Sequence, residues 1–176
     1  MPIHFTAAAA WAVYGGSLRE AIHSLKYKND MGLGDLFANY MIEILRDKDW
    51  SFDLVIPVPL SPQRSRERTY NQSALLSRPI ARYFQRDHST GALRRIKDTG
   101  TQVKRNRMER DLSLAGAFSG NPAKLKGRSV LLVDDIITTG ATINHCSEAL
   151  LQAGAIRVYA VSLAKTFREK VVPEIN

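Results

Sequence analysis

The sequence predicts an α/β domain with a central, mainly parallel β-sheet flanked by helices. The first observation is an unbroken apolar run, VLLVD at residues 130–134, which is typical of a buried parallel strand. A short turn, a helical pattern at residues 141–155 and a second apolar run at residues 156–164 follow it, which is the pattern of a β-α-β unit. The second observation is the length of 176 residues, 44% of them hydrophobic, which fits a single domain (1–176) with its own core.

Hydrophobic periodicity assigns the other elements. Helical spacing is present at residues 17–27, 34–49 and 71–84. Pro79 is expected to kink or restart the last of these helices. Residues 53–60 form a short apolar strand, which their two prolines end near Ile56. In the helix at residues 141–155 the apolar side chains share one face, and Gly154 ends the helix. The alanine-rich segment before the first helix is expected to be an N-terminal strand or packing segment.

Composition narrows the class of protein. The chain has 25 Lys and Arg against 17 Asp and Glu, a net charge of +8, so nucleic acid, phosphorylated metabolites and acidic surfaces are all plausible partners. Its one cysteine, Cys146, excludes an internal disulfide framework and a thiolate zinc cluster. Residues 1–18 are uncharged, but the basic segment of a secretory signal is missing and the apolar run is short for a membrane span. We therefore expect a cytoplasmic protein that is not in the membrane.

The strongest candidate site follows the apolar run at residues 130–134. Asp134 and Asp135 stand at the expected carboxyl edge of the sheet, where α/β proteins bind ligands. The turn after them offers backbone N–H groups, hydroxyl donors and a flexible glycine at the start of a helix, which suits a phosphate monoester. The residues of this turn are Thr138, Thr139, Gly140, Ala141 and Thr142. Two carboxylates suit a vicinal diol, so the whole set is suited to a ribose 5-phosphate.

A simpler alternative exists for the same residues. Asp134 and Asp135 could merely end a strand, while Thr139 or Thr142 caps the next helix. The complete string, placed directly between a buried strand and a helix, favours the functional interpretation.

Residues 130–142 resemble the motif for 5-phosphoribosyl 1-pyrophosphate (PRPP) of type I phosphoribosyltransferases, and nearly the whole chain is similar to the ComF/GntX family. The matching segments are Tyr14, Leu25-Lys26-Tyr27, Pro57-Val58-Pro59-Leu60, Arg64, Arg68, Asn71-Gln72, Thr99-Gly100-Thr101-Gln102 and Gly116-Ala117-Phe118. Two features differ from the family: a four-cysteine zinc module is missing, and Thr69 replaces a glycine. If that glycine has a positive φ, Thr69 would be strained.

The resemblance implies a type I phosphoribosyltransferase-like fold with a flexible hood loop. Residues 1–50 would be an N-terminal helical and hood part, and residues 51–170 the PRPP-binding core. Asp134 and Asp135 would be the catalytic residues at the ribose hydroxyls, and residues 138–142 would bind the 5-phosphate. Pyrophosphate would be bound by Val58, Pro59, Arg64 and Arg68, and the flexible loop would contribute Thr99, Gln102, Lys104 and Arg105.

The implied cofactor is Mg²⁺, bound mainly through PRPP or pyrophosphate, with no metal ligands on the protein. The implied partners are PRPP and an unidentified base or amine; the family also allows a homodimer and an association with nucleic acid or the competence machinery. Cys146 is expected in the core and His145 in solvent. The helix with Arg19, Lys26 and Lys28 is expected to be a solvated face, which in this family also approaches the site.

Three functions remain open from the sequence. The favoured one is an active phosphoribosyltransferase. The others are a PRPP- or nucleotide-sensing protein without catalysis and an accessory protein in DNA uptake or processing. The acceptor substrate is not indicated by any motif.

Overall fold

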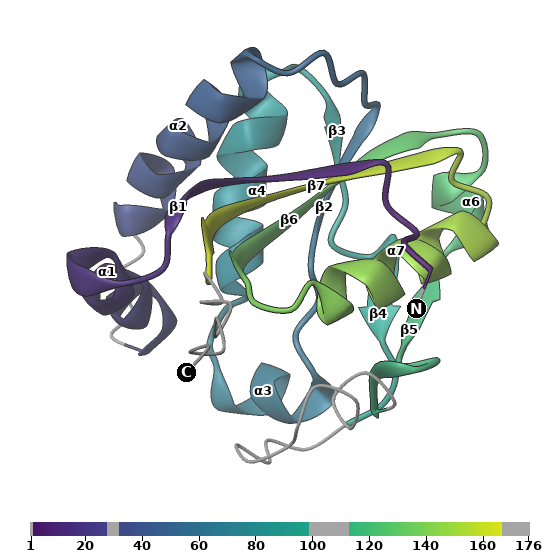
Figure 1. Ribbon diagram of the computed structural model, residues 1–176. Coiled ribbons are helices and arrows are strands. Elements are labelled where there is room, and N and C mark those ends of the chain that lie inside the picture. The colour runs from purple at the N-terminus through teal and green to yellow at the C-terminus, as the bar shows by residue number, and fades with distance from the viewer. Residues whose placement is uncertain (1, 28–31, 99–112, 167–176) are drawn as a thin grey trace, which may run out of the picture.

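The computed structural model describes residues 2–27, 32–98 and 113–166 (Figure 1). The strands are β1 (Ala7–Val13), β2 (Leu54–Pro57), β3 (Asp87–His88), β4 (Leu93–Arg95), β5 (Phe118–Gly120), β6 (Ser129–Ile137) and β7 (Arg157–Lys165). The helices are α1 (Gly16–Tyr27), α2 (Gly32–Arg46), α3 (Pro62–Glu67), α4 (Gln72–Tyr83), α6 (Pro122–Leu125) and α7 (Ala141–Gln152). None of the helices within these described ranges is long and apolar enough to cross a membrane.

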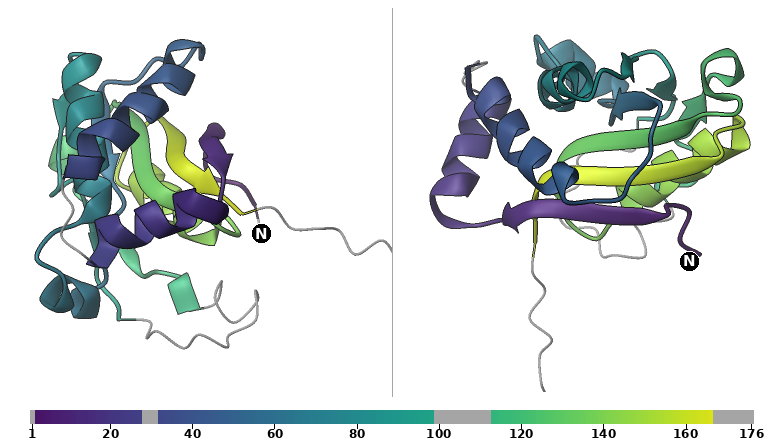
Figure 2. Two further views of the ribbon diagram at one scale, coloured as in Figure 1. Left: turned by 90° about the vertical axis from the view of Figure 1, so that its left-hand side faces the viewer. Right: turned by 90° about the horizontal axis from the view of Figure 1, so that it is seen from above.

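Five strands form one parallel sheet in the order β1-β7-β6-β2-β3. Strands β4 and β5 form a separate antiparallel pair. Strand β6, helix α7 and strand β7 are the β-α-β unit that the sequence predicted, and β6 occupies the middle of the sheet. Strand β1 lies at one edge, as Figure 2 shows. The expected parallel sheet flanked by helices is confirmed.

Successive residues of β6 supply two different hydrophobic layers. Val130 and Leu132 belong to the layer that contains Ile143, Cys146 and Leu150 of α7. The alternate residues of the strand face a second layer, built with side chains from α1, α2 and α4: Leu131, Val133, Ile22, Leu25, Met41 and Ile80. Because side chains of a strand alternate between its faces, a strand that is covered on both sides has to be apolar at every position. The prediction that Cys146 is a core residue is confirmed.

The N-terminal segment is part of the main sheet, as expected. Strand β1 pairs in parallel with β7, and the N–H of Thr6 donates to the carbonyl of Val158 at 2.7 Å. Buried Asn144 on α7 holds the residues before β1: it accepts from the N–H of His4 at 2.7 Å and donates to the carbonyl of Pro2 at 2.9 Å. Residues 2–13 are therefore held by both β7 and α7.

Three sequence-based expectations need correction. Strand β6 does not stop at Asp134 but continues to Ile137, because β7 pairs with it over that whole length. Helix α4 runs through Pro79 without restarting. His145 is buried, with 8% of its surface exposed, and its Nδ1 lies 3.4 Å from Glu148 Oε2. The N-terminal segment is hydrogen-bonded to the preceding residue of α7, Asn144, and such a contact between distant parts of the chain leaves no trace in the periodicity.

Candidate functional site

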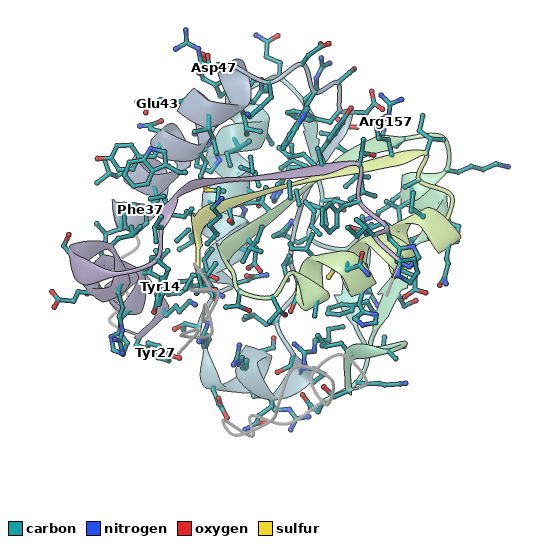
Figure 3. The ribbon with its side chains drawn as sticks, in the orientation of Figure 1. Tyr14, Tyr27, Phe37, Glu43, Asp47 and Arg157 are labelled. Carbon is teal, nitrogen blue, oxygen red and sulfur yellow. The ribbon has the colours of Figure 1, made fainter. Side chains whose placement is uncertain are left out.

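The two segments that were expected to bind PRPP begin side by side at one edge of the sheet. Pro57 at the end of β2 is paired with Val133 of β6, and the N–H of Val58 donates to the carbonyl of Val133 at 2.8 Å. The loop after β2 and the turn after β6 therefore leave the sheet at its carboxyl edge. Figure 3 shows Tyr14 and Tyr27 toward this edge and Arg157, the first residue of β7, at the opposite end.

Asp134 is buried and held by two hydrogen bonds. Its Oδ1 accepts from the Ser73 hydroxyl at 3.1 Å and from the N–H of Asp135 at 2.9 Å. Burial, followed by repulsion from the Asp135 carboxylate, raises the pKa of Asp134 from 3.8 to about 7. The two hydrogen bonds and the charge of Lys26 act in the opposite direction but do not cancel the effect of burial. Asp134 therefore exchanges its proton near neutral pH.

Asp135 is paired with a lysine from the N-terminal part of the chain. Lys26 Nζ lies 2.7 Å from Asp135 Oδ2, and the carboxylate is only 6% exposed. This oxygen accepts no well-aligned hydrogen bond within the described residues, so the contact is an ion pair. Of the two expectations for the basic face of α1, exposure to solvent or approach to the site, the second describes Lys26. A neighbouring counter-charge offsets part of the cost of burying a carboxylate.

The turn between β6 and α7 has an open helix N-terminus. Gly140 is the N-cap residue with a φ of +80°, a conformation that L side chains rarely adopt, and a Cβ there would meet no atom within 4 Å. Conformation, and not crowding, therefore requires glycine here. The Thr139 hydroxyl accepts from the N–H of Ala141 at 3.3 Å. The next N–H groups of α7 have no partner inside the helix, which is the arrangement that binds anions.

Asn71 organises the loop after β2. Its Oδ1 accepts from the N–H of Ser73 and caps helix α4, while its Nδ2 donates to the carbonyl of Val58 at 3.0 Å. Val58 is buried, and both its N–H and its carbonyl are engaged within the protein. Val58 thus shapes the loop that was expected to bind pyrophosphate, and Pro59 is the part of it that faces open space.

Arg68 is fixed by two uncharged partners. It donates to Gln72 Oε1 at 2.7 Å and to the Tyr27 hydroxyl at 3.1 Å, and its guanidinium lies 4.9 Å from the centre of the Tyr27 ring. The neighbouring Thr69 is not strained, since Gln85 is the one non-glycine residue with a positive φ in the described part of the chain. The replacement of the family's glycine by Thr69 is therefore accommodated.

Two hollows flank this loop. The first, which we call the loop groove, has a volume of about 460 Å³ and is lined in part by Pro57, Pro59, Arg68, Asn71, Arg94 and Arg95. The second, which we call the α1 pocket, has a volume of about 410 Å³ and contains Lys26, Tyr27, Arg64 and Arg68. The two predicted pyrophosphate arginines both line the α1 pocket, and of the two Arg68 alone also borders the loop groove.

Sequence reasoning missed several residues of this site. Ser73 was part of a helical pattern, and its contact with Asp134 has no local signal. Arg95 was placed at the start of the hood loop, but it lies in β4 with its guanidinium 5.6 Å from the Phe118 ring centre, and it lines the loop groove. Burial, followed by the charge of Arg64, lowers the pKa of Arg95. Lys26 belongs to the Leu-Lys-Tyr segment at residues 25–27, and only the family resemblance connected this segment with the site.

The predicted loop residues Thr99, Gln102, Lys104 and Arg105 lie outside the described residues. The segment that leads to them is described: Asp98 Oδ1 accepts from the N–H of Gln63 on α3 at 3.0 Å. Among the side chains that the structure describes, no group of three or more His, Cys, Asp or Glu could hold a metal ion.

The raised pKa of Asp134 predicts a pH-dependent contribution to stability. Between about pH 4 and pH 7 the folded protein keeps a proton that the unfolded chain has released, so this group lowers the free energy of unfolding as pH rises, by at most about 1.4 kcal/mol per pH unit. Asp134→Asn should remove this decline, as measured by urea denaturation from pH 4 to pH 8. Asp87→Asn, at an exposed carboxylate, is the control and should keep it. If the free energy of unfolding of Asp134→Asn changes with pH in parallel with that of the wild type, the raised pKa of Asp134 is contradicted.

Comparisons with known proteins identify the family of the chain. The family described as "Phosphoribosyl transferase domain" matches residues 74–174. Competence protein F of Haemophilus influenzae is 32% identical over 151 residues, which is 82% of this chain and 66% of that protein. The DNA utilization protein YhgH of Shigella flexneri is 30% identical over 160 residues, covering 88% of this chain and 70% of that protein. The chain thus spans about two thirds of the length of these curated relatives.

Among solved structures, the glutamine PRPP amidotransferase of B. subtilis complexed with ADP and GMP is similar, with 20% identity and a TM-score of 0.48, over 80% of this chain and 26% of that one.

A further relative by sequence is competence protein ComFC of Bacillus subtilis, which is 28% identical over 145 residues, or 80% of this chain and 56% of that protein. On the family match and the relatives at 30% identity or more, the chain belongs to the phosphoribosyltransferase domain family, in its ComF branch.

Proposed function

We propose that this protein is a cytoplasmic phosphoribosyltransferase that binds Mg²⁺-PRPP and transfers the phosphoribosyl group to a nitrogen acceptor. The observation that carries the proposal is the single connection from β6 to α7. It joins a buried pair of carboxylates to an open helix N-terminus within residues 134–142. Acceptors for a diol and donors for a phosphate at that spacing fit a ribose 5-phosphate.

In the reaction, the acceptor nitrogen forms a bond to C1′ of the ribose while the bond from C1′ to the pyrophosphate oxygen breaks. The electron pair of that bond leaves with pyrophosphate, and the proton of the nitrogen is released to water. Asp134 and Asp135 would hold the ribose by its hydroxyls, and the amides after Gly140 would hold the 5-phosphate. Arg68, Arg94 and Arg95 in the loop groove would bind the developing negative charge of the leaving group.

The side chains at the site fit a magnesium ion that is bound through PRPP and not by the protein itself. The Asp134 carboxylate is engaged by Ser73 and that of Asp135 by Lys26, while the loop groove is lined by arginines that bind oxyanions. When bound to PRPP, the ion would neutralise charge on the pyrophosphate leaving group. The buried, free Cys146 agrees with a reducing compartment such as the cytoplasm.

Ligand binding tests the ribose assignment. Saturating Mg²⁺-PRPP should raise the melting temperature, because a ligand at a hundred times its Kd adds about 2.7 kcal/mol and a chain of this size gains about 2–4 °C per kcal/mol. The double variant Asp134→Asn/Asp135→Asn should lose this rise in a thermal-shift assay. Asp87→Asn, on β3 and away from the acidic pair, is the matched control and should keep it. An equal rise in the double variant would contradict the assignment.

Turnover separates an enzyme from a sensing protein, which is the alternative within the same site. With Mg²⁺-PRPP and a panel of bases and amines, an enzyme should release pyrophosphate in equal amount to a phosphoribosylated product, measured by coupled assay and mass spectrometry. Arg68→Gln should lower the rate because it removes one cation from the leaving-group groove. If PRPP stabilises the protein while every acceptor fails, the sensing function is favoured.

The names of the relatives support a second candidate, an accessory role in DNA uptake or utilisation. The net charge of +8 is compatible with nucleic acid, but residues 95–112 hold no aromatic side chain on which bases could stack. We expect binding of single-stranded DNA to be weak in a fluorescence-anisotropy titration. Tight binding that falls by roughly 0.7 log units per log unit of salt for each phosphate contacted, and that is lost in Lys104→Gln/Arg105→Gln, would instead support direct DNA contact.

A further inference from the structure

The α1 pocket lies next to the proposed ribose site but on the other side of the loop at residues 68–70 from the loop groove. The two hollows share Arg68, Thr69 and Tyr70 in their walls. The α1 pocket also contains Lys26, whose Nζ is 2.7 Å from Asp135. Lys26 therefore connects the α1 pocket with the carboxylate that is proposed to hold the ribose.

Lys26 and Tyr27 at the end of α1 line this pocket, and these two residues and the preceding Leu25 are each bound to a different part of the site. The carbonyl of Leu25 accepts from the Tyr70 hydroxyl. Lys26 pairs with Asp135, and Tyr27 accepts from Arg68 and packs against its guanidinium. Because α1 is fixed at three successive positions, the pocket is formed before any ligand enters, which lowers the cost of binding.

The pocket has an excess of positive charge. Lys26, Arg64 and Arg68 contribute three cations, and Glu67 contributes one carboxylate, which accepts a hydrogen bond from Gln63 Nε2 at 2.8 Å. Arg68 donates to the neutral oxygens of Gln72 and Tyr27. Arg64 makes no ion pair with any residue that the structure describes. Even after the pairing of Lys26 with Asp135, two guanidiniums face the pocket against one carboxylate.

The arrangement of the two hollows fits a displacement at C1′. Transfer requires the acceptor nitrogen and the leaving pyrophosphate on different sides of the ribose carbon. With pyrophosphate in the loop groove and the ribose on Asp134 and Asp135, the α1 pocket is the neighbouring space from which a nitrogen could approach. Arg64 lines this pocket and is therefore placed to bind the acceptor and not the leaving group.

We propose that the α1 pocket is the acceptor site and that it selects a planar nitrogen compound carrying a carboxylate, which Arg64 binds. This inference rests on the proposed phosphoribosyltransferase function and adds the chemical class of its second substrate. A carboxylate matches the forked donors of arginine, and an uncharged amide of the same shape would leave the Arg64 guanidinium without a counter-charge.

Matched pairs of acids and amides test the proposal. Nicotinate with nicotinamide and anthranilate with anthranilamide would be titrated by calorimetry into the full chain in the presence of Mg²⁺ and inorganic pyrophosphate, so that no turnover occurs. We expect at least one acid to bind about tenfold more tightly than its amide. Arg64→Gln should abolish this preference for the acid over the amide. Arg66→Gln, on the same exposed helix but outside both hollows, should keep the preference.

Three results would overturn the proposal. The amides could bind as tightly as the acids, the ratio could be unchanged in Arg64→Gln, or no acid could bind although Mg²⁺-PRPP stabilises the same preparation. The PRPP measurement also separates the two hypotheses. If the protein does not bind PRPP, the phosphoribosyltransferase function itself is refuted. If it binds PRPP but shows no preference for acids, only the proposed acceptor class is refuted.

Discussion

The burial of two adjacent carboxylates at the end of β6 is the constraint around which the site is built. A carboxylate taken out of water without compensation is costly, so its surroundings have to supply hydrogen bonds or an opposite charge. Asp134 obtains them from Ser73 at the start of α4 and from the backbone of Asp135, and Asp135 obtains a charge from Lys26 at the end of α1. The need to compensate these two side chains thus draws both helix ends to the carboxyl edge of the sheet.

The motif residues shared with the ComF family have distinct physical tasks in this fold. Asn71 caps α4 and holds the loop carbonyl of Val58, and Gln72 orients Arg68. Neither has to touch a ligand to matter for the site. Arg68, which lines both hollows, is aligned by the buried side chain of Gln72. The candidate site is therefore a set of arginines that line the two hollows and polar side chains that fix the direction of Arg68.

Local patterns in the sequence predicted the parts of the structure that local physics determines. One continuous segment contains the apolar run of β6, the turn with Gly140 and the helix α7. Their order and spacing could therefore be predicted from the sequence, and the parallel sheet followed from them. The ion pair of Lys26 with Asp135 was not predictable in this way, because it joins distant segments and depends on how α1 packs. The burial of His145 and the length of β6 were misjudged for the same reason, since partners from elsewhere in the chain decide them.

The position of β1 has a consequence for how the chain folds as it is synthesised. Within the part of the chain that the structure describes, the first strand of the sheet pairs with β7, the last, and the residues before it are held by Asn144 on α7. While the ribosome makes the intervening segments, the backbone groups of AAAAWAV have no strand partner in this sheet, and Trp11 can stack on Tyr40 only once α2 exists. The sheet can close at this edge only after Lys165 has emerged, so completion of the fold waits for its most distant contacts.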